Sequence, residues 1–128
     1  MSVLAQAFAV VAALLHVVFF FVESIAFTRP PVHRRFGIMT PEHAEVARPI
    51  MLNQGFYNLF LALGVIIGVV MSNGDGSTEA AGTAVALFGL ACMALAGIVL
   101  AVTSPSLRRA AAMQAVPSLA AIALVVLL

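Results

Sequence analysis

The chain has 128 residues, of which 63% are hydrophobic and only 9% are charged. Soluble domains are about 45–50% apolar and about 25% charged, so this composition excludes an ordinary water-soluble protein. Six basic residues, all of them arginine, and five acidic residues leave a net charge of +1, which excludes the large basic surface that nucleic-acid binding needs. The length allows one domain, and the single cysteine excludes an intramolecular disulfide.

Four long apolar stretches, without charges except for Glu23 near the end of the first, are separated by three polar connectors. Each stretch has about the ~20 residues that a helix needs to cross a hydrocarbon core ~30 Å thick. Four helices of this kind would leave no amphipathic surface for a soluble protein. We therefore predict an all-α, antiparallel up-and-down bundle of four transmembrane helices, as one domain over residues 1–128. The spans are expected at about 3–27, 50–71, 80–102 and 110–128, and the loops at 28–49, 72–79 and 103–109.

The arginines predict the orientation. All six lie in the first and third connectors, which share one side of the membrane in such an array. Short loops rich in arginine stay on the cytoplasmic side. We therefore expect a multi-pass protein of the plasma membrane, surrounded by the lipid bilayer, with both termini on the extracytoplasmic side.

The first connector contains a signal for a helix start. Thr40, Pro41 and Glu42 have the residue types of an N-cap, a proline at the first helical position and an acid in the first turn. A helix that begins there could run into the second span, with a kink at Pro49. Alternatively, a short surface helix could end at Arg48 before a new start. The sequence leaves both open.

Six polar side chains are expected to meet inside the membrane. Counting at ~1.5 Å per residue from the arginine side places Glu23 about 7 Å deep, level with the amides at positions 53 and 54. His16 would lie about 18 Å deep, close to the midplane. Adjacent antiparallel helices would bring these groups together. The predicted cluster comprises His16, Glu23, Asn53, Gln54, Tyr57 and Asn58.

Two interpretations compete for this cluster. As a structural feature, its hydrogen bonds would cross-link two helices, each contributing about 0.6–2 kcal/mol. As a functional site, it would line a cavity that is open to the cytoplasm and that binds a polar head group or relays protons. Six polar residues, with an acid and an imidazole among them, exceed what a helix contact requires. The functional interpretation is therefore favoured.

The other motifs predict packing rather than chemistry. Gly64 and Gly68 form a small-xxx-small motif, and Gly55 is expected to pack against a neighbouring helix as well. No nucleophile elbow, phosphate loop or zinc-protease motif is present, so the catalytic residues, if any, are unknown. We predict no cofactor and no metal site. The third and fourth spans are expected to serve as a scaffold or as the surface for a partner subunit.

The first half of the chain resembles a known family. His16 and Glu23 with aromatic residues between them, followed by the string Asn53-Gln54-Gly55-Phe56-Tyr57-Asn58, are similar to the signature of the bacterial membrane family catalogued as domain of unknown function 1304. The resemblance implies a small four-helix integral membrane protein with no established activity. It marks the polar cluster as important but supplies no reaction.

Three hypotheses for function remain open. The first is a protein whose cavity binds a small amphipathic molecule or lipid from the cytoplasmic side, with or without an enzymatic step. The second is an accessory subunit of a larger membrane complex, and the third is a small proton-coupled transporter. A homo-oligomer is compatible with all three.

Overall fold

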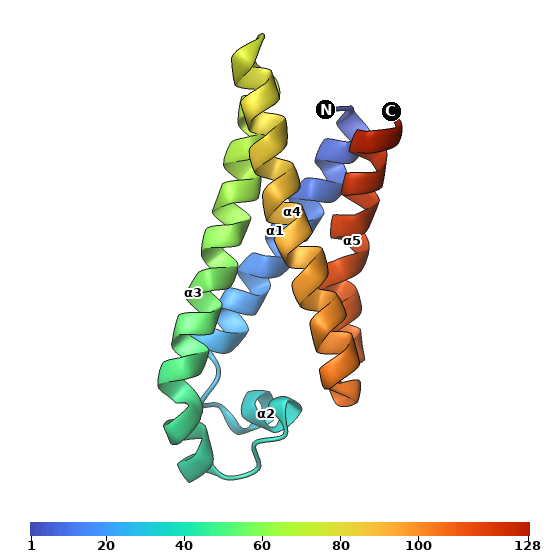
Figure 1. The fold of residues 1–128 in the computed structure, drawn as a ribbon. Coiled ribbons are helices and arrows are strands. Elements are labelled where there is room, and N and C mark those ends of the chain that lie inside the picture. Colours follow the sequence, from blue (N-terminus) through green and yellow to red (C-terminus); the bar gives the residue numbers. More distant parts are fainter.

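The computed structural model describes residues 1–128 and contains helices but no strands (Figure 1). Four segments are long and apolar enough to cross a membrane, which confirms the predicted all-α fold with four membrane helices and indicates a multi-pass membrane protein. They are α1 (Val3–Phe20) with its continuation η1 (Phe21–Ile25), α3 (Pro41–Met71), α4 (Ser77–Thr103), and α5 (Arg108–Leu127) preceded by η3 (Pro105–Leu107). The first connector contains two short helices, α2 (Pro30–His33) and η2 (Arg34–Phe36).

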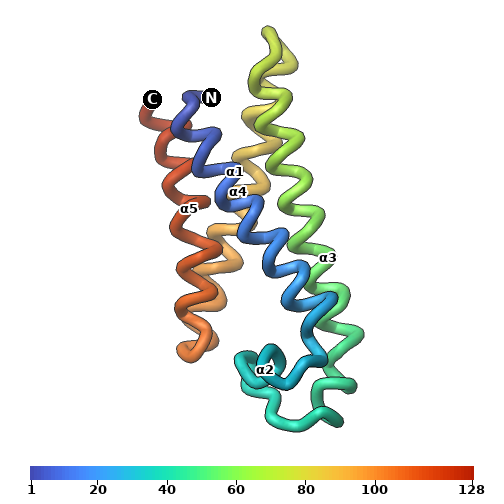
Figure 2. The backbone as a smooth tube through the Cα atoms, turned by 180° about the vertical axis from the view of Figure 1, so that it is seen from behind, coloured from blue at the N-terminus to red at the C-terminus, as the bar shows by residue number.

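The long helices run alternately up and down, and each packs mainly against two neighbours. α1 contacts α3 and α5, and α4 contacts the same two helices from the other side. Both termini lie at the same end as the turn between α3 and α4. The other end, here called the arginine end, holds the first connector and the starts of α3 and α5, which together carry all six arginines (Figures 1 and 2). Towards the arginine end, the α1–α3 pair and the α4–α5 pair diverge from each other (Figure 2).

Small residues fill the centre and let the helices approach closely. The buried core contains many alanines, with Val65, Leu90 and Met93 as larger members. A Cβ atom at Gly68 would lie 2.5 Å from the backbone nitrogen of Ala86, so α3 and α4 are almost in backbone contact there. Close approach of this kind is how helices associate in lipid, where the hydrophobic effect does not drive them together.

The helix α3 begins nine residues earlier than the span expected at residue 50. The hydroxyl of Thr40 accepts a hydrogen bond from the backbone N–H of His43 at 3.3 Å, and Pro41 occupies the first turn, where its missing N–H costs nothing. The helix then continues through Pro49 to Met71. Of the two alternatives for residues 41–48, the structure therefore has the continuous helix. At ~1.5 Å per residue, 31 residues span about 46 Å, so its first turns extend beyond the hydrocarbon.

The first span ends in a π-helical turn. In η1 the backbone N–H of Ala26 donates to the carbonyl of Phe21 at 2.8 Å, five residues back. This wider winding changes the direction of the side chains that follow Phe20, among them Glu23 and Ser24. Single π-helical turns are often found at functional sites.

Candidate functional site

A serine and a glycine fix η1 against α3. The hydroxyl of Ser24 donates to the backbone carbonyl of Leu52 at 2.7 Å. Gly55 is buried beneath Ser24, and a Cβ atom at position 55 would collide with the serine hydroxyl. Glycine at this position therefore lets the two helices approach closely enough for the Ser24 hydrogen bond to form.

Next to this contact, Glu23 and Asn58 join the same two helices. The side-chain amide of Asn58 donates to a carboxylate oxygen of Glu23 at 2.5 Å. Asn58 is buried on α3, whereas Glu23 is half-buried. Because an acid inside a membrane protein needs a polar partner or access to water, this pairing explains how the chain accommodates Glu23 there.

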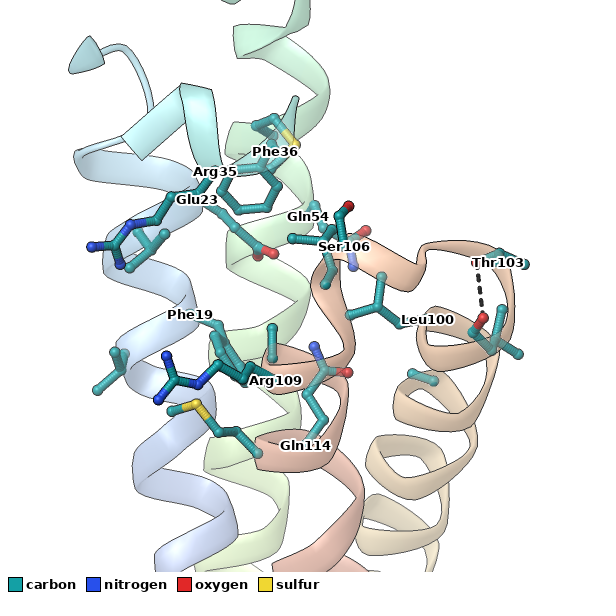
Figure 3. Close-up of a pocket in the computed structure, with 18 residues that line it drawn as sticks. Phe19, Glu23, Arg35, Phe36, Gln54, Leu100, Thr103, Ser106, Arg109 and Gln114 are labelled. Carbon is teal, nitrogen blue, oxygen red and sulfur yellow. Dashed lines mark hydrogen bonds between the residues drawn. The ribbon is translucent and has the colours of Figure 1, made fainter. Parts of the chain in front are cut away.

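The carboxylate of Glu23 faces a cleft of about 1100 Å³ between the diverging helix pairs at the arginine end (Figure 3). Eighteen residues line this cleft, 11 of them hydrophobic. They come from all four long segments and from the first connector, so the cleft forms only when the two halves of the chain pack together. Its charged and polar lining residues are Glu23, Arg35, Gln54, Thr103, Ser106, Arg109 and Gln114.

Two arginines of the cleft have no acidic partner. The one ion pair in the structure joins Arg48 to Glu45 at 3.2 Å on the surface of α3. Arg35 and Arg109 are both exposed, and in the view of Figure 3 both side chains extend toward α1. The polar end of the cleft therefore carries two unpaired guanidinium groups.

Two amides of the cleft also have free hydrogen-bonding groups. Gln54 on α3 and Gln114 on α5 face the cleft, and neither side chain forms a hydrogen bond with the rest of the chain. The main-chain carbonyl of Gln114 does accept a bond, from the hydroxyl of Ser118 at 2.8 Å. Polar groups at this depth are costly without a partner, so the two amides favour a site that water or a ligand fills.

The structure brings together only part of the expected cluster. Glu23 and Asn58 form a hydrogen bond, and Gln54 faces the same cleft as Glu23. His16 is buried outside the cleft, where its Nδ1 lies 2.8 Å from the carbonyl oxygen of Ala12 and its ring packs edge-on against Phe19.

The expectation that Tyr57 and Asn53 would lie in the cluster is corrected. Tyr57 is 60% exposed, Asn53 is also exposed, and neither lines the cleft. Both occupy the expected depth on α3 but a different face of the helix. The buried stripe of α3 follows Gly55, Asn58 and Ala62, which turns positions 53 and 57 away from the other helices.

Two of the three glycines expected at helix contacts lie at such contacts. Gly55 packs under Ser24 of η1, and Gly68 packs against the backbone of α4. Gly64 differs, because a Cβ atom there would have nothing within 4 Å. The small-xxx-small spacing of Gly64 and Gly68 therefore does not correspond to a two-glycine contact surface.

Sequence reasoning missed the second half of the cleft. Arg35 and Arg109 entered only the argument about orientation, and the fourth span, which carries Gln114, was expected to be a scaffold or the surface for a partner subunit. The position of Gln114 could have indicated this. Gln114 lies five residues, about 7–8 Å along the helix, after Arg109 at the start of the fourth span, and Gln54 lies five residues after Pro49 at the start of the second. Counting depth in the fourth span would have placed these two amides at one level.

A family model described as "Protein of unknown function (DUF1304)" matches residues 10–127. The match confirms the resemblance seen in the first half of the chain and extends it through the residues of α4 and α5 that line the cleft. No curated protein and no solved structure matches the chain.

Proposed function

The chain belongs to this family of unknown function, and we propose that it binds a small amphipathic molecule or lipid in the cleft between the α1–α3 and α4–α5 pairs. The observation that carries the proposal is the division of one cleft into an apolar lining and a set of unpaired polar groups. Such a lining suits a ligand with a hydrocarbon part and a polar head. The volume of the cleft, about 1100 Å³, slightly exceeds that of typical small-molecule sites, about 300–1,000 Å³, and leaves room for a ligand with a hydrocarbon chain.

Glu23 forms part of the wall of the proposed site, and Asn58 lies behind it as its hydrogen-bond partner. Their hydrogen bond fixes the carboxylate at the boundary between the two helix pairs, where it can accept a hydrogen bond from a ligand. The second carboxylate oxygen has no partner within the chain, and a carboxylate can accept at both oxygens. Glu23 therefore serves this proposal as a binding residue rather than as a catalytic one.

The ligand would enter from the cytoplasm. All six arginines lie at the cleft end of the molecule, in the first connector, in the first turns of α3 and at the start of α5, and the other end carries none. Because arginine-rich loops stay cytoplasmic, we place the arginine end on the cytoplasmic side of the plasma membrane and both termini on the extracytoplasmic side.

Two phenylalanine substitutions on one helix test the proposed site. Ala110 lines the cleft, whereas Ala112 on the same helix is exposed and outside it. Ala110→Phe would fill part of the cleft, and Ala112→Phe adds the same volume facing lipid. Native mass spectrometry of each variant, purified from membranes in a mild detergent, measures the lipid or other amphiphile that stays bound.

We expect the wild-type protein and Ala112→Phe to retain a bound amphiphile after extensive washing, and Ala110→Phe to lose most of it. Thermal unfolding in lipid-free detergent serves as the control for folding, and it should give all three proteins similar midpoints. Equal retention by a folded Ala110→Phe variant would show that the bound molecules lie elsewhere and would refute the proposed site.

A further inference from the structure

The charged groups of the cleft are two arginines and one acid. Glu23 is the only acid and accepts a hydrogen bond from the neutral amide of Asn58, while Arg35 and Arg109 have no ionic partner, so positive charge is in excess. Glu45 is paired with Arg48 on the surface of α3. The remaining acids do not line the cleft: they are Glu42, Asp75 and Glu79.

Guanidinium groups match the geometry of a phosphate. Each presents a planar fork of N–H donors that can hold two phosphate oxygens at once, and each remains charged at any ordinary pH. Arg35 lies in η2 of the first connector, and Arg109 in the first turn of α5, so the two approach the cleft from separate segments. The free amide groups of Gln54 and Gln114 add further donors to the lining of the cleft.

Resting on the function proposed above, we propose that the amphiphile is an anionic phospholipid whose phosphate is held by Arg35 and Arg109. Its acyl chains would lie along the apolar lining, which includes Val18, Val22 and Met113. Charge complementarity favours this occupant over a neutral or cationic amphiphile. A zwitterionic lipid offers the same phosphate but has no net charge, so the excess of positive charge in the cleft attracts it less than it attracts an anionic lipid.

The pairs of adjacent arginines provide matched variants. Arg35 lines the cleft, while its neighbour Arg34 is exposed outside it. Arg109 also lines the cleft, while its neighbour Arg108 lies outside it and donates a hydrogen bond from Nε to the carbonyl of Ala101 at 3.4 Å. Glutamine removes the charge and keeps most of the side-chain length. The four single variants are therefore Arg35→Gln and Arg109→Gln as tests, with Arg34→Gln and Arg108→Gln as controls.

The measurement compares soluble short-chain lipids. Phosphatidylglycerol and phosphatidylcholine with identical acyl chains are titrated into protein purified in a nonionic detergent, and the thermal unfolding midpoint reports binding. Inorganic phosphate is titrated separately, so that a lipid and a free anion are distinguished. A ligand that binds the folded protein raises the midpoint as its concentration rises.

We expect phosphatidylglycerol to bind at least tenfold more tightly than phosphatidylcholine. Arg35→Gln and Arg109→Gln should each weaken phosphatidylglycerol binding about fivefold and leave phosphatidylcholine binding nearly unchanged, since one arginine near anionic lipid contributes about that much. Arg34→Gln and Arg108→Gln should have little effect.

Three outcomes would overturn the assignment. Equal binding of the two lipids would remove the preference for an anion, and equal losses in all four arginine variants would show attraction by the surface as a whole. Stabilisation by inorganic phosphate alone at the same concentration would point to a free anion. If Ala110→Phe still loses its amphiphile in any of these cases, the cleft remains a binding site and only the headgroup assignment fails.

Discussion

The side-chain amide of Asn58 donates to the carboxylate of Glu23 at 2.5 Å, and this bond joins the first membrane helix to the second across 35 positions of sequence. The two residues have different surroundings. Asn58 is buried against α1, while Glu23 also borders the cleft. One hydrogen bond thus stabilises the helix pair and orients an acid at the proposed site, so its removal has consequences for both.

Asn58→Ala should destabilise the protein by about 1–2 kcal/mol, because it removes the bond and leaves the Glu23 carboxylate without a protein partner. Glu23→Gln should change the free energy of unfolding by less than about 1 kcal/mol, since the glutamine carbonyl can still accept from Asn58. Unfolding in mixed detergent micelles with increasing dodecyl sulfate measures both.

The double variant Glu23→Ala/Asn58→Ala, compared with the two single alanine variants, tests whether the two residues interact, because each alanine removes one partner of the bond. We expect a coupling energy of about 0.5–1.5 kcal/mol between the positions. Strictly additive effects would contradict a direct bond between the two side chains.

Gly64 and Gly68 should respond in opposite ways to alanine. Gly68→Ala places a methyl group 2.5 Å from the backbone nitrogen of Ala86, so α3 and α4 must separate, at a cost of about 1–3 kcal/mol. Gly64→Ala meets no atom within 4 Å and removes a flexible residue from a helix interior, so it should be neutral or stabilising by up to about 1 kcal/mol. The same unfolding assay ranks the two variants, and a larger loss for Gly64→Ala would contradict the observed packing.

The sequence was sufficient to predict four membrane helices, because four long apolar runs are separated by polar connectors. It also predicted that Glu23 would lie near the polar residues of the second span, and the structure pairs Glu23 with one of them, Asn58. It was not sufficient to predict which face of α3 meets α1. That rotation depends on where helices can approach most closely, here at Gly55 under Ser24, and it turned Tyr57 outward.

The cleft itself was beyond sequence reasoning for a related reason. It exists because the α1–α3 pair diverges from the α4–α5 pair, and no local pattern encodes the angle between two helix pairs. The π-helical winding of η1 could not be predicted from the sequence either, since the apolar run continues through Phe21 and Val22 without interruption. Arg35 and Arg109, which the sequence analysis used only to predict the orientation, line the cleft in the structure.

The contact between Ser24 and Gly55 predicts a partial rescue. Gly55→Ala should destabilise the protein by about 1–3 kcal/mol, because the new methyl group collides with the Ser24 hydroxyl. Ser24→Ala alone loses only the bond to the Leu52 carbonyl, about 0.5–1.5 kcal/mol. Since the serine oxygen is the nearest atom to the added methyl, the double variant should be more stable than the sum of the two losses implies. Additive losses would show that the backbone of η1, rather than the hydroxyl, limits the approach.

The proposed orientation predicts which loops an impermeant reagent reaches. Cys92 is half-buried within α4, so Cys92→Ala provides a background without cysteine, into which Met39→Cys or Asp75→Cys introduces one thiol. Met39 lies in the arginine-rich connector and Asp75 in the turn at the opposite end, and both are exposed. In intact cells with the outer membrane made permeable, a charged maleimide should label position 75 and not position 39. Both should react after the inner membrane is opened, which controls for accessibility. Labelling of position 39 alone in intact cells would show the opposite orientation. The cleft would then open on the outer face, because it lies at the arginine end, which also carries Met39.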